Sequence, residues 1–498
     1  NSVKLKDVIL ILTFVLMKLS QQAVYILSAL ALLLASVFTV GFHHADEHFQ
    51  LLEFANYKLG NTELSNLTWE YSSKLRPTLQ PTITVGVIKF LNAFGVQDPF
   101  YIAFFLRLLS SVLALFTMYL LHKVYRDKFQ SPTIKYWFLL TSFLLWITIY
   151  VGARFSSENW SAMFFVIGFS SYFLSFKSSS FKKYLLAGVL MGFSFLFRYQ
   201  AGFMIVGFAA WLLFIEKEKL KYLITFSLVI LSIIGAGVLV DIWFYGEFTF
   251  SAYNYFYENI MLNKAQDYGV DPWWSYITAF IERAIPPFSI LFLGAFGILF
   301  YFKWKNPLTW VLVPFILIHF VLSHKELRFL FPMVYFLPII FFTAIQTIQE
   351  KWKPLFIENR WVKITVKATM LVYGLVLLIV SFKPGEVNVR LYDMVYHRYQ
   401  EPVRLTIATH LYKENEPIHY FYLRDNLTYN KVKDAESFEL NNEEINLLVL
   451  DNQELTEDYK YSHKLVYSSF PNWMKSFNFR GWMERATYRR VYEITISK

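Results

Sequence analysis

The sequence predicts an all-α polytopic membrane protein that carries a small α/β domain at its C-terminal end. Three observations support this. Of the 498 residues, 56% are hydrophobic and only 17% are charged, whereas soluble domains carry about 25% charged residues. Apolar runs approaching the roughly 20 residues that a membrane-spanning helix needs alternate with short polar loops. From Lys383 onward the composition becomes that of a soluble domain.

Hydropathy predicts about 11 transmembrane helices within a membrane domain over residues 1–382. The apolar stretches are Gln22–Phe42, Phe100–Leu121, Tyr136–Val151, Trp160–Phe176, Tyr184–Phe197, Ala201–Ile215, Tyr222–Phe244, Phe288–Phe302, Leu308–Leu322, Phe329–Ile348 and Ile364–Phe382. The chain has no cysteine, which excludes disulfides, thiolate nucleophiles and cysteine-bound metals.

Lysine and arginine collect in alternate loops between these stretches. The residues are Lys4, Lys6, Lys123, Arg126, Lys128, Lys177, Lys182, Lys183, Lys217, Lys219, Lys221, Lys303, Lys305, Lys351, Lys353 and Arg360. The positive-inside rule places these loops in the cytoplasm and the C-terminal tail outside. Because the loops account for the net charge of +10, we expect no nucleic-acid partner.

The opposite, non-cytoplasmic loops hold the unusual polar clusters. They include a first outer loop over residues 43–99 and a long outer loop over 245–287. We expect residues 383–498 to form a soluble extracytoplasmic α/β domain. Its segments IHYFYL, INLLVLD, KLVYSS and RVYEITI are predicted strands, and Glu401–Lys413 is a predicted amphipathic helix that a proline opens.

The first outer loop contains the motif HHADEHFQ, in which Asp46 and Glu47 are adjacent acids among three histidines. A carboxylate within hydrogen-bond reach can act as a general base for a sugar hydroxyl. An inverting transfer needs one such base and no enzyme nucleophile. A solvated acidic loop, or a metal site built from the histidines and acids, are the alternatives.

Several cations lie on the same face as this motif. His324, Lys325 and Arg328, together with Glu326, form a charged cluster between two apolar stretches, and Arg154 and Arg198 lie at the outer ends of two others. Ionisable residues at membrane depth are costly and usually functional, and guanidinium groups bind phosphate bidentately. The alternative is that the long side chains extend to the interface. The aromatics of the long outer loop can stack on sugars or form an interfacial belt.

Five segments of the outer loops resemble one known family. DEHFQLLEFANYKLG and LTWEYSSKLRPTLQP are similar to the first luminal loop of glycosyltransferase family 22, the mannosyltransferases of glycosylphosphatidylinositol-anchor and lipid-linked N-glycan assembly. ARFSSENW, FRYQAGF, DIWFYGEFTFSAYNYFYEN with YGVDPWWSY, and HKELRFLFPMVYFLP follow in the family's order. The resemblance covers roughly Phe42 to Pro338. Tyr71 and the pair Arg76–Pro77 depart from the family pattern, which favours a bacterial or divergent member.

The resemblance implies a GT-C fold, a polyprenyl-phosphate sugar donor, inversion at the anomeric carbon, and no metal or other cofactor. It implies Asp46 as general base with Glu47 beside it. The residues expected to bind the donor phosphate are His324, Lys325, Arg328 and Arg198. Those expected to shape the acceptor side are Gln50, Trp69, Glu70, Arg76, Arg154 and Trp273.

We therefore expect an inverting glycosyltransferase, by the family's habit an α-mannosyltransferase, that acts on a glycan or glycolipid acceptor. Its active site would face the periplasm or lumen, and a bacterial inner membrane is favoured over the endoplasmic reticulum. The alternative is a lipid-linked-sugar flippase or transporter, which should show two related halves with broken helices. The sequence leaves open the sugar, the acceptor, the linkage and the oligomeric state.

Overall fold

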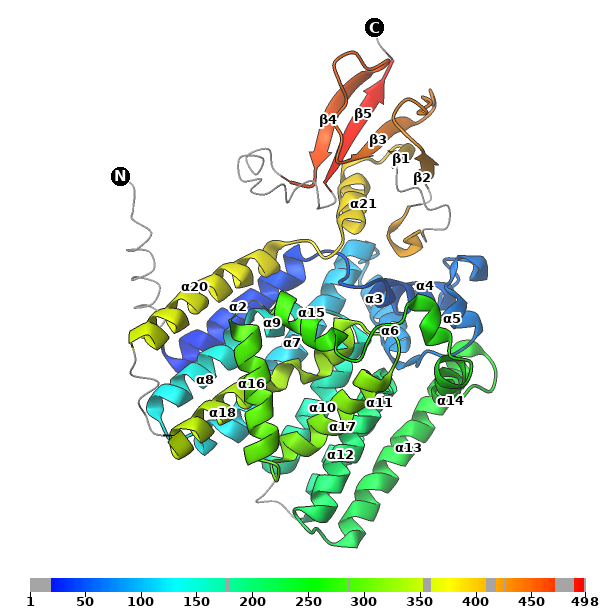
Figure 1. Ribbon diagram of the computed structural model, residues 1–498. Coiled ribbons are helices and arrows are strands. Elements are labelled where there is room, and N and C mark those ends of the chain that lie inside the picture. The colour runs from blue at the N-terminus through cyan, green and yellow to red at the C-terminus, as the bar shows by residue number, and fades with distance from the viewer. Residues whose placement is uncertain are drawn as a thin grey trace.

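The computed structural model describes residues 19–174, 180–284, 287–352, 360–408, 418–424, 426–470 and 488–496, and most of them are helical. Figure 1 shows a large helical part with a small sheet at one end. Each predicted apolar stretch falls largely on one helix or on two consecutive helices. These are α2 (Gln21–Phe38), α7 (Pro99–Tyr125), α8 (Pro132–Leu144) with α9 (Trp146–Gly152), α10 (Ser157–Leu174), α11 (Ser180–Phe197), α12 (Ala201–Phe214), α13 (Leu220–Tyr245), α16 (Phe288–Phe302), α17 (Pro307–Val321), η6 (Leu327–Phe336) with α18 (Leu337–Trp352), and α20 (Arg360–Phe382).

The number of membrane spans is supported only in part. Five helices of the described residues are long and apolar enough to cross a membrane, or up to seven if each of two bent pairs is one span. One such pair is α16 with α17, which meet at an angle of 118°. The expected eleven spans are therefore not confirmed, although a polytopic helical membrane protein is.

Small residues allow close packing between the helices. Ser161 on α10 and Ser194 on α11 exchange two hydrogen bonds, from each hydroxyl to the other residue's carbonyl, at 2.9 and 2.7 Å. Gly207 on α12 is buried where that helix packs against α17. Such pairs of small or hydroxyl residues are typical of helix contacts within membranes, where hydrophobic burial supplies little driving force.

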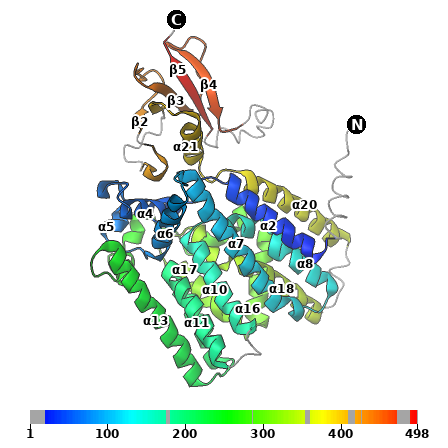
Figure 2. The ribbon, with the colours of Figure 1, turned by 180° about the vertical axis from the view of Figure 1, so that it is seen from behind.

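Short helices cover the end of the helical part that carries the sheet (Figures 1 and 2). From the first outer loop come α3 (Ala45–Phe49), α4 (Leu52–Lys58), η1 (Leu64–Asn66), α5 (Trp69–Ser72) and α6 (Leu79–Ala93). From the long outer loop come α14 (Ser251–Phe256), η4 (Tyr257–Met261), η5 (Lys264–Tyr268) and α15 (Ser275–Arg283). The polar motifs of both loops thus lie at one end of the molecule.

The C-terminal part contains α21 (Val387–Arg398) and a five-stranded mixed sheet of order β2-β1-β3-β5-β4. The strands are β1 (Val403–Ala408), β2 (Leu427–Val432), β3 (Ile445–Asp451), β4 (Ser462–Ser468) and β5 (Arg489–Thr495). β1 runs parallel to both β2 and β3, whereas β5 runs antiparallel to β3 and β4. Three of the predicted strands, INLLVLD, KLVYSS and RVYEITI, are confirmed. The boundary between residues 382 and 383 stays a prediction.

Two predicted elements in this part are wrong. The helix expected over Glu401–Lys413 is a strand at Val403–Ala408, and residues 409–413 lie outside the described ones. This strand is buried on nearly every residue between two parallel neighbours. Its residues Val403–Ile407 alternate between apolar and polar, which is the period of a strand and not of a helix. IHYFYL forms a 3₁₀ turn at Tyr420–Tyr422, because it contacts the helical part instead of pairing in the sheet.

That turn joins the C-terminal part to the first outer loop. The backbone N–H of Phe421 donates to Oε1 of Glu53 on α4 at 2.9 Å, and the ring nitrogen Nε2 of His48 on α3 lies 2.7 Å from the same oxygen. Glu53 and His48 are almost fully buried.

A second close contact between the two parts involves Gly41, which lies so near Glu386 that a Cβ atom on Gly41 would overlap it. The φ of Gly41 is +94°, a backbone conformation that suits glycine.

We expect Gly207→Ala to lower the free energy of unfolding by about 1–3 kcal/mol, as overpacking does. The added methyl would overlap the backbone carbonyl of Trp310 on α17, and the two helices would have to separate. Gly294→Ala on α16 is the matched control, since no atom lies within 4 Å of its Cβ position. Thermal unfolding in detergent measures both variants, and equal midpoints for Gly207→Ala and Gly294→Ala would contradict the expected clash.

Candidate active site

The helix α3 turns the two adjacent acids of the first outer loop toward different surroundings. Consecutive residues of an α-helix point about 100° apart. Oδ2 of Asp46 lies 2.8 Å from Nη1 of Arg328 on η6. Glu47 instead accepts a hydrogen bond from the backbone N–H of His43 at 3.2 Å and lines a small cavity with Arg107 and Arg154. Of the two acids, only Asp46 belongs to the ion cluster described next.

Asp46 is surrounded by cations and polar groups. Besides Arg328, Nη2 of Arg76 lies 3.8 Å from Oδ2, and Nδ1 of His44 lies 3.3 Å from Oδ1. Burial alone would raise the pKa of this carboxyl, but Arg328 and His44 outweigh that effect and hold the pKa well below its usual range. Asp46 is therefore a carboxylate at neutral pH.

Two glutamates that were not among the expected site residues complete the cluster. Oε1 of Glu158, at the start of α10, lies 3.2 Å from Nη1 of both Arg328 and Arg198. Glu326 lies 2.5 Å from Nε of Arg328, and burial would raise its pKa, but the Arg328 contacts lower it to about 2. Glu158 lies in the motif ARFSSENW and Glu326 in the motif HKELRF. Their position inside these motifs is the sequence feature that could have identified them.

The residues expected to bind phosphate are only partly together. Arg328 and Arg198 share Glu158, and Nε2 of His324 lies 2.9 Å from Glu326. Lys325 turns aside, since its Nζ donates to the backbone carbonyls of Asp271 and Leu322. Arg328, Arg198 and His324 thus form one connected group, and Lys325 lies beside it.

Three of the residues expected on the acceptor side lie next to Asp46. Nη2 of Arg76 donates to Oε1 of Glu70 at 2.8 Å, and Nε2 of Gln50 donates to the same oxygen at 3.1 Å. Trp69 begins the same short helix as Glu70, and its indole N–H donates to Tyr268 of the long outer loop at 2.7 Å. The first and the long outer loops therefore meet at this point.

Arg154 and Trp273 lie outside this group. Arg154 is buried and donates to the carbonyls of Thr39 and Gly41 at 3.4 and 3.5 Å, beyond the C-terminal end of α2. Trp273 is 56% exposed and packs on Trp274 and Phe320. These contacts are those of a loop anchor and of a surface aromatic.

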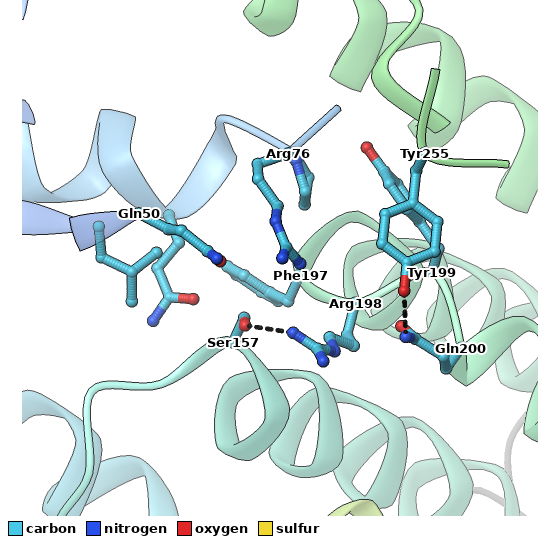
Figure 3. Close-up of a pocket in the computed structure, with 11 residues that line it drawn as sticks. Gln50, Arg76, Ser157, Phe197, Arg198, Tyr199, Gln200 and Tyr255 are labelled. Atoms are coloured by element: carbon cyan, nitrogen blue, oxygen red, sulfur yellow. Dashed lines mark hydrogen bonds between the residues drawn. The ribbon is translucent and has the colours of Figure 1, made fainter. Parts of the chain in front are cut away.

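A small hollow, named the polar pocket here, opens beside Arg76. Its lining includes Gln50, Arg76, Gln80, Arg198, Gln200 and Tyr255. Figure 3 shows Arg198 donating to the hydroxyl of Ser157, and Gln200 donating to the hydroxyl of Tyr255. The pocket is thus lined by amides, hydroxyls and two arginines, together with the apolar side chains of Leu51, Pro77 and Phe197, and these residues come from five separate segments of the chain.

A second, larger cavity of about 320 Å³ lies beside η6, the segment that also carries Arg328. Its lining is almost wholly apolar. Leu327, Leu330 and Phe331 of η6 line it together with residues of α9, α15, α16 and α17. Arg328 itself reaches Asp46 instead. The ion cluster therefore borders an apolar chamber through η6 and a polar pocket through Arg76.

Among the described residues, no three side chains of histidine, aspartate or glutamate are grouped so that they could hold a metal ion. The absence of a metal requirement stays a prediction.

We expect the contribution of Glu47 to the stability of the protein to fall as the pH rises from about 4.5 to 7. Burial raises the pKa of this carboxyl from 4.5 to about 7 in the folded state, although Arg154 partly opposes it. A raised folded-state pKa gives stability that is complete at low pH and is lost as the pH passes through the folded value. Glu47→Gln should lack this loss. The difference between its unfolding midpoint and that of the wild type should therefore shift in favour of the variant as the pH rises to 7, and should stay constant above pH 7. Parallel curves from pH 4.5 to 9 would contradict the shift.

Comparisons with known proteins agree with this architecture. The sequence model of the Alg9-like mannosyltransferase family matches residues 23–416. The chain is 26% identical over 295 residues to GPI alpha-1,2-mannosyltransferase 3 of Xenopus laevis, which is 58% of this chain and 53% of that protein. It is 27% identical over 318 residues to GPI mannosyltransferase 3 of Candida albicans, 64% of this chain and 61% of that protein. The matches thus span little more than half the length of these relatives.

The fold is also that of a solved enzyme. The crystal structure of ArnT from Cupriavidus metallidurans bound to undecaprenyl phosphate matches with a TM-score of 0.51 at 12% identity, over 95% of this chain and 98% of that one. At this identity the likeness concerns the fold alone, which is the expected GT-C fold. Because the family model covers most of the sequence, including both outer loops, the chain belongs to the Alg9-like mannosyltransferase family.

Proposed function

We propose that this protein is an inverting α-mannosyltransferase that moves mannose from a polyprenyl-phosphate-linked donor to a glycan or glycolipid acceptor on the non-cytoplasmic face. The observation that carries the proposal is the position of Asp46. This carboxylate contacts Arg328, whose neighbours in η6 line the apolar cavity, and lies near Arg76, which lines the polar pocket. The proposed lipid, phosphate and sugar sites would thus meet at Asp46.

Asp46 is proposed as the general base. It would accept the proton of the acceptor hydroxyl as that oxygen attacks the anomeric carbon, while the lipid phosphate leaves from the opposite face. A carboxylate is available for this at neutral pH because Arg328 lowers the pKa of Asp46. Positioned general bases contribute typically 10²–10⁴-fold to rate.

Arg328, Arg198, His324 and Lys325 are proposed to bind the donor phosphate. Guanidinium groups fit phosphate oxygens bidentately, and cations fixed where charge develops stabilise the transition state. The apolar cavity, with room for part of a polyprenyl chain, would hold the lipid next to them. An incoming phosphate competes with Asp46 for Arg328, and losing that contact would make Asp46 a stronger base. Donor binding would then activate the base.

The sugar and the linkage are inferred from relatives. Both matched proteins are named GPI mannosyltransferases, and the Xenopus laevis relative is named an alpha-1,2 enzyme. Mannosyl transfer to a mannose-containing glycolipid is therefore the first activity to test. No observation favours the flippase alternative, since the charged cluster lies at one end of the helices and the named relatives are transferases. Whether the host membrane is bacterial or endoplasmic-reticular stays a prediction.

Asp46→Asn should lower mannosyl transfer by at least 100-fold while leaving donor binding at least as tight as in the wild type. The amide cannot accept the proton, but Arg328 loses one of its three carboxylate partners and becomes more available to the phosphate. Transfer from polyprenyl-phosphate [¹⁴C]mannose in detergent, and binding of the same donor, measure the two effects. Asp127→Asn, an exposed acid beyond the opposite end of α7, is the control. Full activity of Asp46→Asn would remove Asp46 as the base.

The proposed independence of metal ions is tested in the same assay. Transfer by the wild type should persist after treatment with EDTA, and restoration of a lost activity by Mg²⁺ or Mn²⁺ would overturn this part of the proposal.

Arg328→Gln should weaken donor binding by about 10- to 100-fold, because a charge-assisted contact to phosphate is lost. Lys325→Gln should weaken it less, since Lys325 is already engaged by backbone carbonyls. Arg126→Gln, on an exposed cation at the other end of the protein, is the matched control. Unchanged donor affinity in Arg328→Gln would exclude this arginine from the phosphate site.

A further inference from the structure

One buried side chain in the polar pocket has no visible purpose in the fold. Gln80 on α6 is only 2% exposed, and both its amide nitrogen and its amide oxygen lack a hydrogen-bond partner among the described residues. The side chain lines the pocket. Buried amides nearly always bond to protein, water or ligand, because an unpaired buried group keeps its full desolvation cost. The unused amide therefore indicates an occupant.

The wall of the pocket is rigid around this amide. Asp241, at the end of α13, accepts hydrogen bonds from the backbone N–H and the hydroxyl of Thr78, at 3.0 and 2.6 Å, and from Ser251. Ser251 in turn is 2.6 Å from the hydroxyl of Tyr199. These contacts fix the start of α6, the long outer loop and the turn between α11 and α12, so the pocket is formed before any ligand binds.

Charge in the pocket is already balanced. Arg76 is paired with Glu70 at 2.8 Å, and Arg198 is paired with Glu158 at 3.2 Å. The groups left to recognise a ligand are the amide of Gln80 and the Nε of Arg76, which has no partner among the described residues and can only donate. Gln200 and Tyr255 lie beside them and bond to each other (Figure 3). An amide can donate and accept at once, as a hydroxyl does. The group that matches the Gln80 amide is therefore one that both donates and accepts.

The size of the pocket limits what can enter. Its volume is about 20 Å³, whereas one water needs about 10–15 Å³. A single hydroxyl on its carbon fits, but a whole sugar ring does not. Arg76 lines the pocket, and its Nη2 lies 3.8 Å from Oδ2 of Asp46, so a ring with one hydroxyl in the pocket would lie beside the arginine that contacts the base.

We propose that the polar pocket binds one hydroxyl of a substrate sugar, with Gln80 as its hydrogen-bonding partner, and thereby selects sugars that carry this hydroxyl. The proposal rests on the proposed transferase function and adds a specificity-determining residue to it. The sugar can belong to the donor or to the acceptor, since either ring must approach Asp46.

The experiment compares monodeoxy analogues in the full-length protein. The donor series is polyprenyl-phosphate mannose and its monodeoxymannose forms, and the acceptor series is octyl α-mannoside and its monodeoxy forms. In the wild type, one analogue of one series should lose about 10- to 100-fold in kcat/KM. In Gln80→Leu the loss for that analogue should shrink to near onefold, because the partner of the missing hydroxyl is gone. The series in which the loss occurs identifies the sugar as donor or acceptor.

Thr84→Val is the matched control. Thr84 is one turn further along α6, is fully buried and does not line the pocket. This variant should keep the wild-type discrimination, and thermal unfolding shows whether each variant is folded. If Gln80→Leu does not fold, Gln80→Glu takes its place. Its discrimination among the monodeoxy forms should then differ from that of the wild type, and equal discrimination would overturn the proposal.

The outcomes separate this proposal from the function on which it rests. Equal use of every monodeoxy form by the wild type, or the same discrimination in Gln80→Leu, would mean that the pocket holds only a water molecule and would overturn the proposal. If no donor is used with any acceptor, the proposed function fails instead. In that case saturation-transfer NMR measures the binding of the octyl α-mannoside series to the wild type and to Gln80→Leu. Weaker binding of one monodeoxy form by the wild type, but not by Gln80→Leu, would support the proposed role of the pocket.

Discussion

The ion pair between Asp46 and Arg328 joins residues 282 positions apart in the chain, and the arrangement of the candidate site depends on it. Arg328 carries a charge that is 7% exposed, and it meets three carboxylates, those of Asp46, Glu158 and Glu326. Removing one partner of a buried pair leaves an uncompensated charge and is strongly destabilising. The outer loop, α10 and η6 are therefore held together by one guanidinium, and a phosphate that enters must rearrange that balance.

The ordered motifs of the sequence contain most of the site residues, because each motif supplies one wall of it. Asp46, Gln50, Glu70, Arg76 and Arg328 are close together, as the resemblance implies. The roles of these residues are still predictions. What the motifs cannot supply is direction: Asp46 and Glu47 are neighbours in the chain but about 100° apart around the helix, so only Asp46 pairs with Arg328.

Other features follow from contacts distant in sequence. Glu158 matters because two arginines from other segments reach it, and the missing bonds of Gln80 exist only in the packed structure. Composition and hydropathy found the helices, since an apolar stretch of the right length has few alternatives. They failed at Val403–Ala408, where the helix was predicted from the longer segment Glu401–Lys413 although Val403–Ile407 alternate between apolar and polar residues as a strand does.

The contact between Phe421 and Glu53 bears on whether the C-terminal part can be removed or exchanged. The carboxylate of Glu53 is buried on α4, next to the acid-bearing helix α3, and one of its hydrogen bonds comes from the backbone of the C-terminal part. A backbone donor is independent of side-chain identity, so this hydrogen bond requires the segment itself, while the buried ring of Phe421 adds packing at the same junction. The sheet-bearing part is thus a structural component of the outer loop and not a detachable module, and chimaeras that exchange it must carry the turn at Tyr420–Tyr422 with it.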